Sequence, residues 1–295
     1  MPKTQHWQWY VEQFAPTEAH AHAIEETYYA GETEFQSVAV IRTAVFGTML
    51  VLDGDTQSSQ SDERIYHEAL VHPALAGCND RSNVLILGGG EGATLREVLR
   101  APDVKRCTMV DIDGQVVELA KKYLSQWADG AFEDPRTRLI IGDALAFLSE
   151  DTERYGAVIS DLTEPLEDSP SNPLFCEEVF GKIKARLVQG GVYVLQASTA
   201  GLHNMTLHAK MARTLRKQYR HVRSFYTHVP AFDNDWAFIA CSDHVDSSAL
   251  AQSTIDTYVR SLHGENFFYD AETHRRLFSL PLYLRRELAK PGETF

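Results

Sequence analysis

The order of apolar and polar positions divides the chain into two parts with different periods. From about residue 34, β-forming residues occur in short runs that are broken by turns such as Asp-Gly-Asp at 53–55. This pattern predicts a small antiparallel sheet that ends near residue 60. Residues 1–30 are rich in aromatic and polar residues, and we expect an irregular or partly helical lead-in there.

Beyond residue 80, apolar runs alternate with helix-like periods, which is typical of a doubly wound α/β fold with a mostly parallel sheet. Strands are predicted at 84–87, 107–111, 138–142, 157–161, 191–196, 222–228 and 236–241. Helices are predicted at 65–75, 93–100, 114–124, 143–150, 176–187, 203–219 and 247–262. The tail, 263–295, is polar with an aromatic patch. We therefore expect an N-terminal β-domain with its lead-in at 1–62 and a larger α/β domain at 63–295.

The stretch NVLILGGGEG at 83–92 predicts a buried strand, a tight glycine turn and a helix start. Such a turn binds nucleotides, because the free N–H groups of the helix face the ligand. The sequence also satisfies GxGxxA, so a nicotinamide dinucleotide is an alternative. Glu91 argues against it, since an acid there repels pyrophosphate and attracts an amine or a sulfonium.

Three successive strands end in an acid or lead directly into one: Asp111, Asp143 and Asp161. Ligands of a doubly wound sheet bind outside the carboxyl ends of its strands, so these acids and Glu91 are expected around one crevice. Asp111, at the end of the second strand, has the position that accepts ribose hydroxyls. Asp143 either contacts an adenine amino group or only caps the next helix.

The segment ISDLTEP at 159–165 places Asp161 and Glu164 three residues apart at a strand end. One interpretation is a solvated surface pair. The other is an amine site, because a primary amine with a pKa near ~10.4 arrives protonated and must lose its proton before it attacks. The following stretch, 163–174, is rich in Pro, Ser and acids, a composition that suits a lid.

Composition narrows the class of protein. The chain has 295 residues, 44% hydrophobic and 23% charged, and its net charge of −13 comes without the basic cluster that nucleic acid requires. No apolar run reaches membrane-spanning length, and the first residues lack a signal-peptide core. The four cysteines are widely spaced without a CxxC pair, which indicates neither a disulfide framework nor a zinc site. We expect a cytoplasmic protein without a bound metal.

From about residue 35 to 245 the chain resembles the polyamine aminopropyltransferase (spermidine synthase) family. The matching stretches are MLVLDGDTQ (49–57), DERIYHEALVHPAL (62–75), NVLILGGGEGATLREVLR (83–100), VDIDGQVVELAKKYL (110–124), GDALAFL (142–148), ISDLTEP (159–165), LFCEEVF (174–180) and HVPAFDNDWAF (228–238). The GGGEGATLRE and YHE variants are most similar to the branch that contains agmatine or triamine aminopropyltransferases and thermospermine synthase.

The resemblance implies a Rossmann-like catalytic domain, a small N-terminal β-domain and a homodimer or homotetramer. The implied reaction moves an aminopropyl group from decarboxylated S-adenosylmethionine, a co-substrate rather than a cofactor, to a polyamine. The implied donor site is lined by Gln36, Tyr66, His67, Gly88, Gly90, Glu91, Asp111, Asp143 and Ala144. The implied acceptor site is lined by Asp161, the general base, together with Glu164, Tyr66 and Phe232. Read from the sequence alone, Tyr66 and His67 fit core or surface equally well, and Gln36 fits the solvent face of a strand.

The chain departs from the family at several of these positions. Many members have Gln at His67, Asp at Glu91 and Tyr at Phe232, and an Asp where Glu164 stands. One extra methylene moves a carboxylate by ~1.5 Å, enough to change which amine fits. Two alternatives stay open: an S-adenosylmethionine methyltransferase and a non-catalytic polyamine- or nucleoside-binding protein. A methyltransferase usually has an acid where this chain has Ile86.

Overall fold

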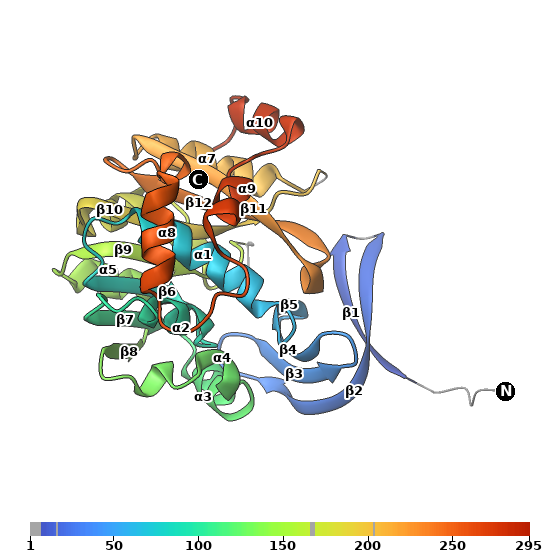
Figure 1. The fold of residues 1–295 in the computed structure, drawn as a ribbon. Coiled ribbons are helices and arrows are strands. Elements are labelled where there is room, and N and C mark those ends of the chain that lie inside the picture. The colour runs from blue at the N-terminus through green and yellow to red at the C-terminus, as the bar shows by residue number, and fades with distance from the viewer. Residues whose placement is uncertain (1–6, 16, 166–168, 203) are drawn as a thin grey trace.

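The computed structural model describes residues 7–15, 17–165, 169–202 and 204–295, and it contains two sheets (Figure 1). The N-terminal sheet is antiparallel with the order β1-β2-β3-β4-β5. Its strands are β1 (Gln8–Ala15), β2 (Glu18–Glu32), β3 (Ser37–Thr43), β4 (Gly47–Leu52) and β5 (Asp55–Ser59).

The expectation of an irregular or partly helical lead-in is wrong for residues 8–15 and 18–30, while residues 1–6 lie outside the described part. These residues form β1 and the long strand β2, which pair antiparallel, with His20 opposite Glu12. The strand β2 has almost no buried side chain. Its sequence therefore lacks the apolar alternation by which strands are predicted, and pairing with β1 and β3 defines it instead.

The second sheet has the order β11-β12-β10-β9-β6-β7-β8. Its strands are β6 (Asn83–Gly88), β7 (Arg106–Asp111), β8 (Thr137–Ile141), β9 (Tyr155–Asp161), β10 (Leu187–Thr199), β11 (His221–Val229) and β12 (Asn234–Ser242). Neighbours from β8 to β10 are parallel, and β12 is antiparallel to both β10 and β11. The predicted α/β class and all seven predicted strands are confirmed.

The helices are α1 (Glu63–Gly77), α2 (Ala93–Leu99), α3 (Gly114–Tyr123), α4 (Ser125–Ala128), α5 (Ala144–Glu150), α6 (Glu177–Arg186), α7 (Thr206–Arg216), α8 (Gln252–Ser261), α9 (Ala271–Leu277) and α10 (Leu282–Ala289). Short 3-10 turns are η1 (Ala131–Glu133), η2 (Asn172–Leu174), η3 (Pro230–Phe232) and η4 (Ser247–Ala249). The sequence predicted α1, α2, α3, α5, α6, α7 and α8, but neither the short helix α4 nor the two helices of the tail. No helix of the described part is long and apolar enough to cross a membrane.

The strand β6 lies at the centre of two hydrophobic layers, one on each face of its sheet. Successive strand residues point to opposite faces, so Val84 and Ile86 pack with the helices α1, α2 and α8, while Leu85 and Leu87 pack with α5, α6 and α7. All four side chains are fully buried. This explains the unbroken apolar run that precedes the glycine turn.

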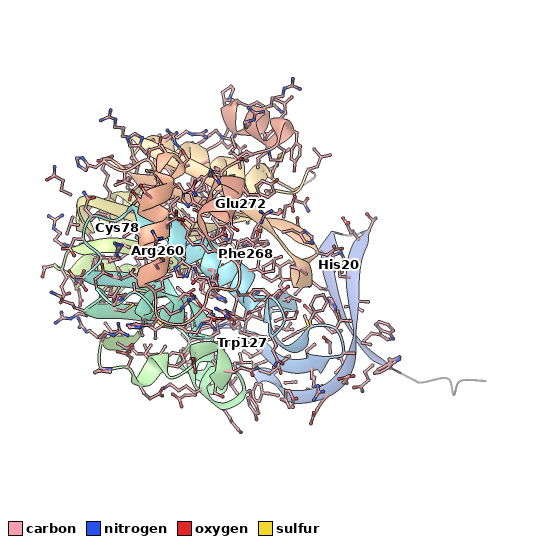
Figure 2. The ribbon with its side chains drawn as sticks, viewed as in Figure 1. His20, Cys78, Trp127, Arg260, Phe268 and Glu272 are labelled. Atoms are coloured by element: carbon pink, nitrogen blue, oxygen red, sulfur yellow. The ribbon has the colours of Figure 1, made fainter. Side chains whose placement is uncertain are left out.

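The N-terminal sheet meets helices of the larger domain at a third apolar cluster. Residues of β3 and β4, including Val40 and Leu50, pack against the helices α2, α3 and α4, where Trp127 is almost completely buried (Figure 2). Burial of each large apolar side chain contributes roughly 1.5–3 kcal/mol. The contact fixes the N-terminal sheet beside the carboxyl ends of β6 and β7.

Candidate active site

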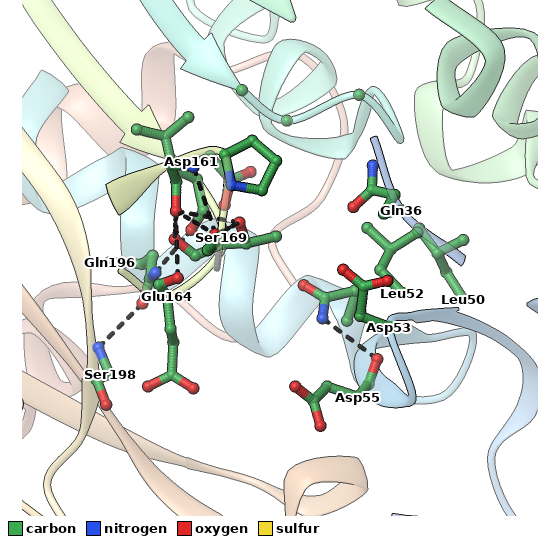
Figure 3. Close-up of a pocket in the computed structure, with 18 of the residues that line it drawn as sticks. Gln36, Leu50, Leu52, Asp53, Asp55, Asp161, Glu164, Ser169, Gln196 and Ser198 are labelled. Atoms are coloured by element: carbon green, nitrogen blue, oxygen red, sulfur yellow. Dashed lines mark hydrogen bonds between the residues drawn. The ribbon is translucent and has the colours of Figure 1, made fainter. Parts of the chain in front are cut away.

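A cavity of about 940 Å³ lies between the carboxyl ends of the parallel strands and the N-terminal sheet (Figure 3). It collects residues that are far apart in sequence. The sequence-predicted residues that line it are Gln36, Tyr66, Gly88, Gly90, Glu91, Asp111, Asp143, Ala144, Asp161, Glu164 and Phe232. The exception is His67, which does not line the cavity.

The glycine turn brings β6 close to its neighbours. Gly88 has a φ of +83°, and a Cβ there would lie 2.2 Å from the carbonyl oxygen of Asp161. The N–H of Gly89 donates to that same oxygen at 2.9 Å. A Cβ on Gly90 would lie 2.9 Å from Oδ2 of Asp111. These glycines let the turn approach the acids at the ends of β7 and β9.

Asp161, at the end of β9, is held by two hydroxyl donors. Its Oδ1 accepts a hydrogen bond from the Tyr66 hydroxyl at 2.8 Å, and its Oδ2 accepts one from Thr94 Oγ1 at 2.5 Å. Burial of the tyrosine raises the pKa of Tyr66 well above its ordinary value, and the Asp161 charge raises it further, so Tyr66 remains a donor. Both carboxylate oxygens retain lone pairs for a ligand.

Glu91 lies against His67, and the distance from Nε2 to Oε1 is 2.6 Å. The other ring nitrogen, Nδ1, lies 2.7 Å from the backbone oxygen of Glu63 and 3.1 Å from its carboxylate. Because both ring nitrogens face acceptors, both carry a proton. Burial alone would lower the pKa of His67, but the carboxylates of Glu91 and Glu63 raise it well above its ordinary value. Arg96 binds both oxygens of Glu63 in turn.

Asp111 lines the cavity, and its surroundings include a residue that the prediction missed. Burial raises the pKa of Asp111 to about 6, while the N–H of Asp113 donates to its Oδ1. Asp113 caps α3, and its Oδ2 accepts from Nε2 of Gln36 at 2.9 Å and from Thr33 at 2.6 Å. Gln36 thus lies just before β3 rather than on the solvent face of a strand. An acid directly before a helix start is a capping signal, which would have identified Asp113.

Asp143 caps a helix, as one of its two interpretations predicted, and contact with an adenine amino group stays a prediction. It caps α5 by accepting from the N–H of Leu145 at 2.7 Å, and it also lines the cavity beside Ala144. The cap fixes the carboxylate at the helix N-terminus, where the helix dipole favours negative charge.

Aromatic rings form part of the cavity wall. Phe232 in η3 packs edge-on against Tyr66, with ring centroids 6.1 Å apart, and against Trp236 at 5.0 Å. Glu164 follows β9, and burial raises the pKa of its carboxyl while Ser198 hydrogen-bonds to it. Ser198 and Trp236 were not predicted, because β10 and β12 carry no local chemical signal at these positions.

The segment 163–174, expected to form a lid, is described only in part, since residues 166–168 lie outside the described residues. In the rest, the hydroxyls of Thr163, Ser169 and Ser171 hydrogen-bond to one another. Ser171 also donates to the backbone oxygen of Thr163 at 2.9 Å. Within the described chain, no group of three or more His, Cys, Asp or Glu side chains is arranged to hold a metal ion.

Comparison with known proteins agrees with this geometry. Residues 63–250 match the model of the spermine/spermidine synthase domain, and residues 8–60 match that of the spermidine synthase tetramerisation domain. The polyamine aminopropyltransferase of Sulfolobus acidocaldarius is 42% identical over 283 residues, which cover 96% of this chain and 93% of that protein. The polyamine aminopropyltransferase of Sulfurisphaera tokodaii is 41% identical over 288 residues, 97% of this chain and 95% of that protein.

Comparison with solved structures also identifies spermidine synthases as similar proteins. A spermidine synthase in complex with the transition state analogue AdoDATO superposes with a TM-score of 0.89 at 26% identity, covering 95% of this chain and 94% of that one. The spermidine synthase of Thermotoga maritima gives a TM-score of 0.86 at 26% identity, with the same coverage. The fold and the acidic cavity therefore define an enzyme of the polyamine aminopropyltransferase type. The chain belongs to the spermidine synthase family, as its motifs predicted.

Proposed function

We propose that the protein transfers the aminopropyl group of decarboxylated S-adenosylmethionine to a nitrogen of a polyamine acceptor such as putrescine, agmatine or a triamine, and releases methylthioadenosine. One observation carries the proposal: the charge of the cavity wall. The acids that line it are Glu12, Asp53, Asp55, Glu91, Asp111, Asp143, Asp161 and Glu164. No Lys, Arg or His of the described chain lines it. Both proposed substrates are cations, a sulfonium and a polyammonium.

The donor end is formed by the glycine turn and the acids around it. We assign the ribose hydroxyls to Asp111 and the adenine amino group to Asp143. The amine of the aminopropyl group is assigned to Glu91. The other donor-side residues are Gln36, Tyr66, Gly88, Gly90 and Ala144, while His67 acts from behind Glu91.

The reaction needs alignment and removal of one proton. The acceptor nitrogen forms a bond to the propyl carbon next to sulfur, and the C–S bond breaks with its electron pair going to sulfur. Because the sulfonium already makes that carbon electrophilic, the protein has to orient both substrates and accept a proton from nitrogen. In our proposal the Asp161 carboxylate accepts this proton. Tyr66 and Thr94 hold it in place, and Glu164 and Phe232 line the acceptor side.

The donor carries no α-carboxylate, which distinguishes it from S-adenosylmethionine. An α-carboxylate beside Glu91 would place like charges together in a buried site, whereas a free amine there finds a counterion. At Ile86, where methyltransferases usually have an acid, the side chain is buried in the core. Both features support aminopropyl transfer over methyl transfer.

The direct test incubates the protein with decarboxylated S-adenosylmethionine and, separately, putrescine, agmatine and spermidine, and measures methylthioadenosine release. Product with at least one amine supports the proposal. Methylated amine formed from S-adenosylmethionine would instead indicate a methyltransferase. Tight amine binding without turnover would indicate a non-catalytic binding protein. Where variants that remove one acid are compared with the wild type below, Glu26→Gln, at an exposed position of β2, serves as the charge-matched control.

We also propose a homodimer or homotetramer that forms through the N-terminal sheet. The match of residues 8–60 to a tetramerisation domain supports this, as do two large apolar side chains on one face of β1, Trp9 and Val11, which are 57% and 56% exposed. Light scattering after gel filtration measures the mass directly. Trp9→Glu is expected to yield a smaller species, and an unchanged mass would exclude this face as the interface.

A further inference from the structure

The N-terminal sheet forms part of the cavity wall. Four acids line the cavity besides those at the glycine turn and the strand ends: Glu12 on β1, Asp53 and Asp55 around the β4–β5 turn, and Glu164 after β9. Like charges in a partly buried site destabilise one another unless hydrogen bonds or cations compensate them. An acid whose charge is compensated by hydrogen bonds within the protein has a structural role, whereas an acid without such partners is available to a ligand.

Two of these acids are occupied by hydrogen bonds within the sheet. Glu12 accepts from the N–H of Thr56 at 2.9 Å and from its hydroxyl at 2.8 Å, which ties β1 to β5. Asp53 accepts from the N–H of Ser37 at 2.8 Å. Both are therefore part of the sheet's own hydrogen bonding.

Among the described residues, the Asp55 carboxylate has neither a hydrogen bond nor an ion pair, and Glu164 has a hydrogen bond from Ser198 but no ion pair. Figure 3 shows the Glu164 side chain extending away from Asp161, with the Asp55 carboxylate on the same side of the pocket. Burial raises the pKa of both carboxyls, and the Asp55 charge raises that of Glu164 further. A cation between them would offset this repulsion.

A row of aromatic rings in contact with one another also lines the cavity and begins at Asp161. Tyr66, which donates to Asp161, is followed by Phe232 and then by Trp236. Flat apolar surfaces of this kind accommodate the methylene chain of an aliphatic amine. The wall therefore links a nitrogen at the reacting end to a second nitrogen at the far end.

We infer that Asp55 is a specificity-determining residue: together with Glu164 it binds the second cationic nitrogen of the acceptor and selects amines with two or more charges over monoamines. This inference rests on the proposed function, since it concerns the acceptor end of the same cavity. It adds the N-terminal sheet to the acceptor site, to which the sequence motifs assigned only residues of the larger domain.

The test uses two amines of equal length that differ in one charge, 1,4-diaminobutane and 1-aminobutane. Binding to the full-length protein is measured by calorimetry with methylthioadenosine present. For Asp55→Asn we expect the diamine dissociation constant to rise about tenfold, the range of a charge-assisted hydrogen bond, with no change for the monoamine. The charge-matched control Glu26→Gln should change neither value.

Two results would overturn the inference. One is an Asp55→Asn protein that binds the diamine as tightly as the wild type. The other is an equal loss for both amines, which indicates a structural role for Asp55. Turnover is measured separately. If the wild type releases no methylthioadenosine with any amine, the proposed reaction is contradicted. The calorimetric comparison still decides the role of Asp55 in that case.

Discussion

The two ends of the cavity compensate their acids differently. At the end formed by the glycine turn and the neighbouring strand ends, three acids have fixed partners: Glu91 has the His67 imidazolium, Asp111 has backbone N–H groups, and Asp161 has two hydroxyls. At the far end, Asp55 and Glu164 have no cationic partner among the described residues. The first arrangement fixes orientation before a ligand arrives, and the second leaves negative charge for the ligand to neutralise.

The different partners of the acids correspond to the different tasks of the two ends in the proposed reaction. The reacting carbon and nitrogen must be aligned closely, so the groups around them are held by hydrogen bonds from α1, α2 and the glycine turn. Recognition of the far end of a flexible amine needs charge more than rigid geometry. The comparison therefore separates residues that control turnover from residues that control acceptor choice, and each prediction below tests that separation.

The largest effect is expected for Asp161→Asn. The amide retains the shape and the hydrogen bonds from Tyr66 and Thr94 but accepts a proton poorly, so we expect turnover to fall by about 10²–10⁴-fold. Methylthioadenosine binding and the melting temperature should stay close to the wild-type values. Turnover within a few-fold of the wild type would show that another group accepts the proton.

The second prediction concerns the fixed charge behind Glu91. His67→Ala leaves the buried carboxylates of Glu63 and Glu91 without the imidazolium between them. Breaking a buried pair in this way costs about 3–5 kcal/mol, so we expect the free energy of unfolding in urea to fall by that amount. His67→Gln retains a donor toward Glu91 and should lose less. Equal stability of the alanine variant and the wild type would mean that the pair is not formed.

The third prediction moves charge at the far end without removing it. Glu164→Asp withdraws the carboxylate by ~1.5 Å, which should change the ranking of acceptors by about tenfold in kcat/KM while leaving the KM for the donor unchanged. The panel is putrescine, agmatine and spermidine. An unchanged ranking would place Glu164 outside the acceptor's reach.

The periodicity of the chain was sufficient to predict the larger sheet. Its strands are buried on both faces, and continuous apolar runs such as 84–87 report that environment directly. The strand β2 could not be predicted in this way, because most of its side chains are exposed and its backbone pairing carries no apolar signal. The helices α9 and α10 of the tail were missed because each is short, has few buried residues and, unlike the equally short α2 and α5, does not follow a strand of the alternating pattern.

The acids of the site were predictable where strand ends and glycine turns mark them, as for Asp111 and Asp161. Residues that enter the cavity from the N-terminal sheet carry no such mark. In the sequence, Asp55 is only one residue of a turn-forming triplet, and its place in the cavity wall depends on the packing of β3 and β4 against α2, α3 and α4. A long-range contact of that kind has no local pattern.

The smallest expected effect is the pH dependence of nucleoside binding at the fixed end. Burial raises the pKa of Asp111 to about 6, from the ordinary value of 3.8. Below pH 6 the carboxyl is increasingly protonated and accepts fewer hydrogen bonds from ribose hydroxyls. Methylthioadenosine affinity, measured by calorimetry, should therefore fall a few-fold between pH 7 and pH 5. The variant Asp111→Asn should bind more weakly at pH 7 and show a flatter profile.

The stability of the empty protein should respond to Asp111 with the opposite sign. Because the pKa is higher in the folded state than in the unfolded chain, the folded state binds this proton more tightly. The contribution of Asp111 to the free energy of unfolding is therefore fully present below pH 3.8 and is lost as the pH rises through 6. The difference in stability between wild type and Asp111→Asn, measured in urea from pH 7 to pH 5, should move toward the wild type as the pH falls. A difference that is constant across this range would show that Asp111 titrates normally.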